Sequence, residues 1–182
     1  MPPLIPPLRA HSRFALSLVL AIGTLARPAS ATVVAMSTAE LTEASPLVIV
    51  GRVARTQAQW TPDHQRIVTL AAVLVDDVVK GQWGRHRVIV EREGGEVGDI
   101  GLLVTDTPNF AKGERVVLFL TPAREERGQT IHHVVGEIQG KYQVDDHDVA
   151  KKKDIDAVGD VGRIDFELPF DELIAKIRRA VR

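Results

Sequence analysis

Residues 67–79 restrict the fold more than any other stretch of this sequence. They are apolar and rich in β-branched side chains, which predicts a β-strand. Successive side chains of a strand point to opposite faces, and here both faces are apolar. One face holds Val68, Leu70, Ala72 and Leu74, and the other holds Ile67, Ala71, Val73 and Val75. We therefore expect other parts of the protein to cover both faces of this strand.

Four more segments predict strands: 47–53, 87–92, 116–120 and 131–138. Residues 140–144 are expected to extend or close the sheet. The polar stretch 57–65 predicts a loop and 122–129 an exposed turn, while the glycines of 94–101 indicate a bulged turn or sharp bend. Together these features predict a mainly β (α+β) fold with a five-stranded, strongly bent antiparallel OB-like barrel, and a sandwich is the alternative.

A helix is predicted at each end of the expected sheet. Ser37 and Glu40 have the spacing of a capping box, which predicts a short helix through Glu43. Residues 169–182 form the second, an amphipathic C-terminal helix with acids in its first turn and arginines in its last. Its apolar positions are Phe170, Leu173, Ile174, Ile177 and Val181. We expect this helix to cover the outer face of the strand at 67–79.

The first 31 residues have the pattern of a signal peptide. Basic residues precede an apolar run at 14–26, and Ala29 and Ala31 suit a signal-peptidase site, so Thr32 would begin the mature chain. The run is too short to span a bilayer of about 30 Å. We expect an exported protein, periplasmic or secreted, without a stable membrane anchor after cleavage; an uncleaved N-terminal anchor is the alternative.

Composition excludes several classes of function. The chain has no cysteine, so disulfides, thiol nucleophiles and thiolate metal sites are absent. Without the expected leader, 20 basic residues face 24 acidic ones, a formal charge of −4 that gives no overall electrostatic attraction to nucleic acid. The expected organisation is a signal peptide at 1–31, the OB-like domain at 32–144, an acidic and lysine-rich loop at 145–168, and the C-terminal helix at 169–182.

Several of these segments also carry a resemblance to a known domain. The matching segments are 48–53, 78–81, 94–101, 110 with 113–120, and 135–141. They resemble a domain of secreted, mostly uncharacterised bacterial proteins that sometimes precedes a matrixin-like metalloprotease. The order of elements is also similar to the OB-type barrel of netrin-like and metalloproteinase-inhibitor domains. The sequence has no His-Glu-x-x-His, and Thr32 would stand where such inhibitors use a cysteine, so the resemblance implies no catalytic residue.

Candidate nucleophiles and metal ligands are few. Beyond the expected leader the only serines are Ser37 and Ser45, and no Gly-x-Ser-x-Gly elbow exists. His132 and His133 are adjacent, but neighbours on a strand point to opposite faces and cannot easily chelate one ion. Thr32 would become N-terminal after cleavage, but signal peptidase exposes whichever residue follows its site, so this position does not indicate a threonine nucleophile. We expect no catalytic residue, no cofactor and no metal.

Two further patterns could indicate binding sites, and each has a structural interpretation. Asp154, Asp156, Gly159 and Asp165 occupy positions 1, 3, 6 and 12 of a calcium loop, but Val158 replaces the ligand at position 5, so a charged surface loop is expected. Trp60 and Trp83 are interpreted as residues that cap the barrel, without a neighbouring aromatic or basic cluster for stacking.

Three hypotheses of function follow. The first is a non-enzymatic binding module that contacts another envelope or secreted protein. The second is a modulator or inhibitor of a secreted metalloprotease, acting through a loop such as Asn109 or 94–101 at the barrel rim. The third is a calcium-binding protein or an enzyme of unrecognised type, which would show converging His, Asp or Glu side chains in a pocket.

Overall fold

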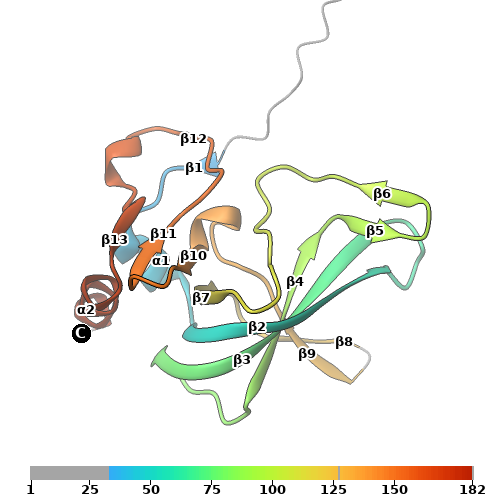
Figure 1. The fold of residues 1–182 in the computed structure, drawn as a ribbon, viewed down its shortest axis with the longest axis horizontal. Coiled ribbons are helices and arrows are strands. Elements are labelled where there is room, and N and C mark those ends of the chain that lie inside the picture. Colours follow the sequence, from blue (N-terminus) through green and yellow to red (C-terminus); the bar gives the residue numbers. More distant parts are fainter. Residues whose placement is uncertain (1–32, 127, 182) are drawn as a thin grey trace, which may run out of the picture.

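A computed structural model describes residues 33–126 and 128–181 (Figure 1). The expected signal peptide, with Ala29, Ala31 and Thr32 at its cleavage site, lies outside the described residues. Within the described ranges, no helix combines the length and apolar character that crossing a membrane requires.

The centre of the fold is a nine-stranded mixed sheet. Its order is β13-β11-β10-β7-β2-β3-β4-β9-β8, and every neighbouring pair is antiparallel except β4 and β9. The strands are β2 (Leu47–Trp60), β3 (Ile67–Lys80), β4 (Arg87–Glu93), β7 (Arg115–Leu120), β8 (Arg124–Glu126), β9 (Gln129–His132), β10 (Lys141–Val144), β11 (Val149–Lys151) and β13 (Glu167–Pro169).

Two small sheets and two helices complete the described chain. The hairpin of β5 (Gly95–Val97) and β6 (Ile100–Leu102) turns at Gly98, and β1 (Val33–Val34) pairs in parallel with β12 (Ala157–Val158). The helices are α1 (Thr38–Ala44) and α2 (Phe170–Ala180), and short 3₁₀ turns η1 (Glu137–Gly140) and η2 (Val161–Arg163) lie in connections.

The mainly β class with a helix near each end is confirmed, but the closed barrel of five strands is not. The described strands form an open order that ends at β13 and β8. Closure requires the two outer strands to pair with each other. Here each side is extended instead, by β11 and β13 beyond β10 and by β9 and β8 beyond β4.

Both predicted helices are confirmed. Ser37 accepts from the Glu40 backbone N–H at 3.3 Å, and the Glu40 carboxylate accepts from the Ser37 N–H at 2.9 Å, so the capping box is complete. α2 begins with Asp171 and Glu172 in its first turn and ends with Arg178 and Arg179 in its last, which matches the helix dipole.

The first four residues of the expected loop at 57–65 are strand. β2 continues to Trp60, where Gln57 pairs with Leu70 and Gln59 with Val68. Backbone pairing does not require apolar side chains, and Gln57 can remain exposed on an open face. The true connection is therefore only 61–66.

The chain between His132 and Asp165 also differs from its prediction. β9 ends at His132, because the backbone turns through positive φ at Gly136 (65°) and Glu137 (55°) and cannot stay extended to residue 138. The expected loop at 145–168 contributes β11 and most of β13 to the main sheet, and it contributes β12 to a small one. Composition favoured a loop there, but strand pairing uses backbone groups, which charged side chains do not block.

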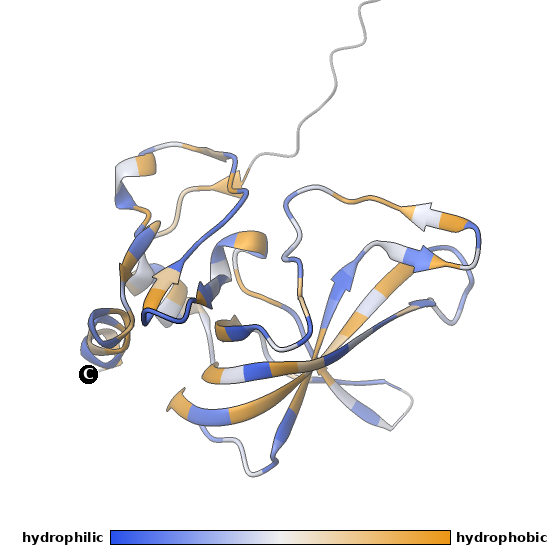
Figure 2. Ribbon diagram, in the orientation of Figure 1, coloured by the Kyte–Doolittle hydropathy of each residue, from blue (hydrophilic) through white to orange (hydrophobic). Residues whose placement is uncertain are grey.

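β2 and β7 bury apolar side chains on both faces, and Figure 2 shows hydrophobic residues along the central strands. One face packs against the helices and Tyr142, in a core that includes Leu41, Val48, Val50, Val117, Phe119, Leu173 and Ile177. The other face packs against β3 and β4, in a core that includes Leu47, Ile49, Val73, Val88, Val90, Val116, Leu118 and Leu120. The two-sided cover predicted for 67–79 is thus found most completely on β2 and β7.

The expected position of α2 over β3 is correct only at one end of the strand. Val79 packs against the core that α2 covers, whereas Leu74 is 46% exposed. A helix about 10 Å across covers roughly two strands that lie about 4.8 Å apart. Because α2 packs on the β2 and β7 side, part of the apolar outer face of β3 is left open.

Candidate functional site

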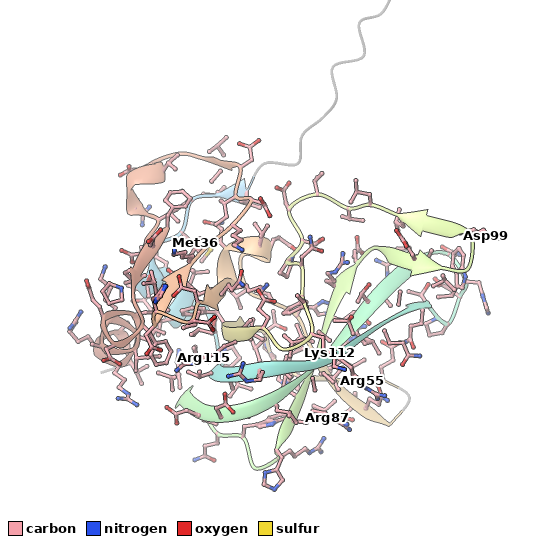
Figure 3. All side chains as sticks on the ribbon, viewed as in Figure 1. Met36, Arg55, Arg87, Asp99, Lys112 and Arg115 are labelled. Carbon is pink, nitrogen blue, oxygen red and sulfur yellow. The ribbon has the colours of Figure 1, made fainter. Side chains whose placement is uncertain are left out.

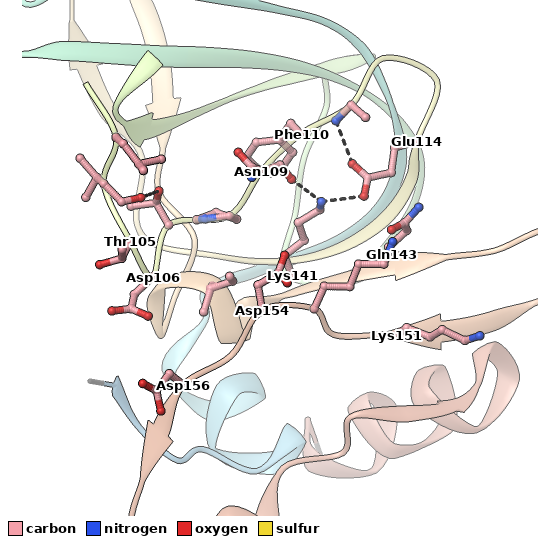
Figure 4. A pocket seen from close by; sticks show the side chains of 17 residues that line it. Thr105, Asp106, Asn109, Phe110, Glu114, Lys141, Gln143, Lys151, Asp154 and Asp156 are labelled. Carbon is pink, nitrogen blue, oxygen red and sulfur yellow. Dashed lines mark hydrogen bonds and ion pairs between the residues drawn. The ribbon is translucent and has the colours of Figure 1, made fainter. Parts of the chain in front are cut away.

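A cleft of about 650 Å³ lies between the loop 103–111 and the segment 151–156 (Figure 4). We call it the loop cleft. Side chains from the loop form one wall, the end of β11 and the residues after it form the other, and β10 supplies the base. Its polar and charged lining residues are Thr105, Asp106, Thr107, Asn109, Glu114, Lys141, Gln143, Lys151, Lys153, Asp154 and Asp156.

A buried ion pair ties the loop to the base of this cleft. The Lys141 ammonium donates to Glu114 Oε1 at 2.6 Å and to the backbone oxygen of Asn109, as the dashed lines of Figure 4 show. Glu114 Oε2 accepts from the Ala111 N–H at 3.0 Å, and the ammonium lies 5.1 Å from the Phe110 ring centroid. Burial lowers the pKa of Lys141, and the hydrogen bond and charge of Glu114 oppose that shift.

Changing Glu114 to Gln should destabilise the protein by about 1 to 2 kcal/mol, because the largely buried Lys141 charge loses its counterion. Urea denaturation of the variant and of wild type measures the difference. The double variant Glu114→Gln/Lys141→Met removes both charges, so its loss should be smaller than the sum of the two single losses. Strictly additive losses would show that the two side chains are not coupled.

The mouth of the loop cleft is partly apolar. Leu103 is 91% exposed, and the adjacent Leu102, the last residue of β6, is 38% exposed. The loop is tied to η1, where the Ile138 N–H donates to the Asp106 backbone oxygen at 3.0 Å. Within the loop, the Thr107 hydroxyl donates to the Val104 backbone oxygen at 3.0 Å. The exposed leucine is thus presented by an anchored segment.

The histidines do not join this cleft. The His132 ring nitrogen Nδ1 lies 2.8 Å from the Thr121 backbone oxygen, and its ring packs edge-on against Trp83 at 5.2 Å. His133 Nε2 lies 3.9 Å from Glu91. The two rings therefore have different partners, as the strand geometry predicted. Among the described residues, no histidine lines the loop cleft, but four carboxylate side chains do: Asp106, Glu114, Asp154 and Asp156.

The four residues of the calcium pattern do not converge. Both oxygens of Asp165 are engaged, by the Thr38 hydroxyl at 2.7 Å and by Lys176 at 2.6 Å. Asp154 and Asp156 instead line the loop cleft. Among residues 33–126 and 128–181, no group of three His, Asp or Glu side chains is placed to hold a metal ion.

A second cleft, of about 520 Å³, surrounds Trp83. We call it the arginine groove, because Arg55, Arg85 and Arg87 line it together with His86. The expectation that Trp83 lacks a basic neighbourhood is therefore wrong. The signal was present in the sequence, since a basic run at 85–87 follows Trp83 after one glycine. The contribution of Arg55 required the pairing of β2 with β3.

A comparison with known proteins found no matching family model and no matching curated protein. The resemblance to secreted bacterial domains and to OB-type inhibitors therefore stays a prediction.

Proposed function

We propose that this protein is an exported, non-enzymatic binding module that receives part of a protein partner in the loop cleft. The observation that carries the proposal is the exposed Leu103 at the mouth of a cleft whose basal charges are already paired with each other. Exposed apolar side chains that lie next to one another are typical of an interaction surface, and Leu103 is adjacent to Leu102, which is 38% exposed. The N-terminal export signal is part of the same proposal.

The basal groups are better suited to positioning than to catalysis. A general acid or base must reach the proton that it transfers. Both Glu114 oxygens already accept hydrogen bonds, and the Lys141 ammonium already donates to Glu114 and to Asn109. This pair therefore supports an interpretation as a clamp on the loop, which keeps the cleft open in a fixed shape.

The cleft favours a polypeptide with mixed character. One wall offers the exposed Leu103 and the partly buried Phe110, and the other offers Lys153 beside Asp154 and Asp156. A partner segment could place an apolar side chain between the walls while its polar groups meet the charged rim. Such a polar rim around an apolar centre is the common arrangement of protein interfaces.

Changing Leu103 to Asp should weaken partner binding at least about tenfold, because a charge replaces an apolar contact at the centre of the interface. The partner is first captured with a photo-crosslinking residue at position 103 in the native host. The matched control carries the crosslinker at Val181, which directly follows α2 and is 46% exposed. The binding proposal fails if positions 103 and 181 give the same products, or if Leu103→Asp leaves the affinity unchanged.

The metalloprotease alternative uses the same region. The segment 94–101, expected as a bend at the barrel rim, forms most of the β5–β6 hairpin, whose last residue, Leu102, precedes Leu103 of the loop cleft. If the partner is a secreted metalloprotease, the purified protein should inhibit it and Leu103→Asp should relieve that inhibition. Binding without any change in proteolysis would favour the simple binding module.

A further inference from the structure

The open part of the β3 face is a groove with an apolar floor. Alternate residues of three paired strands form this face, and the register places Ala72 between Arg55 and Ile89 and places Leu74 opposite Arg87. The floor consists of Leu70, Ala72, Leu74 and Ile89. The apolar residues of this face predict that it is covered, but Leu74 remains 46% exposed in the described chain.

The groove carries uncompensated positive charge. Its lining includes three arginines and a histidine but no acidic residue. Within the described chain, none of Arg55, Arg85 and Arg87 lies within 4.0 Å of a carboxylate. Five arginines outside the groove, by contrast, each contact an acid: Arg66, Arg115, Arg124, Arg163 and Arg178.

The acids nearest to this face are already engaged. Glu91 and Glu93 continue the same face of β4, but Glu91 pairs with Arg124 at 2.8 Å and Glu93 pairs with Arg66. Arg85 donates to the Thr130 hydroxyl at 2.8 Å, and that hydroxyl donates onward to Glu125. Arg55 and Arg87 therefore remain the groups that an incoming anion would meet first, and Figure 3 shows both on the exposed side of the sheet.

We propose that the arginine groove binds an extended, acidic segment of a partner polypeptide. Arg55 lies on β2 and Arg87 on β4, with β3 between them, so their backbones are separated by about 9 to 10 Å across the sheet. Arg87 is also displaced by two residues along β4 from Ile89, the residue aligned with Arg55. In an extended peptide, alternate side chains lie about 7 Å apart. Carboxylates at spaced positions can thus reach both guanidinium groups, which bind carboxylates in a bidentate manner.

The apolar floor favours a peptide over a nucleic acid. Binding of single strands relies on several aromatic side chains that stack on bases. The groove has one such side chain, Trp83, and its ring already contacts His132 at 5.2 Å and Arg85 at 5.7 Å. The aliphatic residues of the floor instead suit the apolar side chains between the acids of an extended peptide.

The test uses a fluorescein-labelled peptide with glutamate at alternate positions and leucine or alanine between them. Fluorescence anisotropy of the mature protein should show binding, and Arg55→Gln/Arg87→Gln should weaken it at least about tenfold through the loss of two charge-assisted contacts. The matched control is Arg178→Gln/Arg179→Gln, which removes the same charge from α2 and should leave binding within about twofold. All four arginines are exposed, so both variants should keep the wild-type melting temperature.

Three results would overturn the assignment. One is equal binding of a peptide with glutamine in place of glutamate, and another is equal loss in the two double variants. The third is tighter binding of a labelled oligothymidine than of the acidic peptide, which would indicate a nucleic-acid groove. Leu103→Asp should leave peptide binding unchanged, so this outcome is independent of the partner at the loop cleft.

Discussion

Replacing Lys152 with methionine should raise the free energy of unfolding at pH 7 by about 2 to 4 kcal/mol, because it removes a buried charge that lacks a close counterion. Lys152 is only 7% exposed, and its ammonium has no hydrogen-bond partner within the described residues. It lies 4.5 Å from the Tyr142 ring centroid. Burial lowers the pKa of Lys152 to about 7, although the charge of Asp165 opposes the shift.

This pKa shift fixes the pH dependence of stability. The lysine pKa is 10.5 in the unfolded chain and about 7 in the folded one. Between these pH values the unfolded chain binds more protons, so the stability of wild type should rise as the pH increases from 7 towards 10. The Lys152→Met variant lacks this contribution. Its advantage over wild type should be largest near and below pH 7 and should shrink as the pH rises.

Chemical denaturation at several pH values measures both effects. Lys153→Met is the matched control, since Lys153 is the exposed neighbour and its replacement should change stability by less than about 0.5 kcal/mol. A Lys152→Met variant that is less stable than wild type at pH 7 would mean that the ammonium gains more from Tyr142 and Asp165 than its burial costs. A difference that does not vary with pH would contradict the lowered pKa.

Replacing Gly51 with alanine should destabilise the protein by about 2 to 4 kcal/mol through steric overlap in the centre of the sheet. A Cβ at this position would lie 2.3 Å from the Leu74 backbone oxygen and 2.8 Å from Val73 Cγ1. Gly51 also adjoins a register irregularity between β2 and β3. The closest clash is with a backbone atom of β3, and a backbone atom cannot relieve the overlap by changing rotamer as a side chain can.

The control for this prediction is Gly84→Ala. A Cβ there meets nothing within 4 Å, so the thermal unfolding temperature should stay close to that of wild type. A fall of several degrees is expected for Gly51→Ala alone. Equal unfolding temperatures for the two variants would show that close packing between β2 and β3 does not require glycine at position 51.

Local sequence signals predicted the elements that depend on neighbours in the chain. The capping box at Ser37 defines the start of α1, and the apolar spacing from Phe170 to Ile177 defines the buried face of α2. Both signals act within one or two helical turns, so they do not need the rest of the fold. The strand predicted at 116–120 was likewise found as β7, with a start one residue earlier.

Elements that depend on distant partners were predicted less well. The polar end of β2 is strand because β3 pairs with it, and β11 exists because β10 and β13 lie on either side. The closed barrel was not confirmed for the same reason: β11, most of β13 and β8 extend the sheet, and they come from segments whose composition predicts a loop or a turn. Strand propensity is a weak guide where pairing decides.

The candidate sites show the same division. The basic run beside Trp83 can be read directly from the sequence, but Arg55 joins it only across the β2–β3 pairing. The loop cleft joins 103–111 to 151–156, and the ion pair at its base joins residues 27 positions apart. No local pattern in the chain indicates that these groups converge.

The order of residues along the chain is enough to predict a cysteine-free, apolar β core with a capped helix before it and an amphipathic helix after it. These features can be predicted because side-chain period, capping and backbone freedom act over a few residues. Three other features emerge from the folded protein alone: which faces are covered, the burial of Lys152 without a close counterion, and the three arginines that line an open apolar face. These features depend on the register and packing of segments far apart in the chain, which the local pattern does not specify.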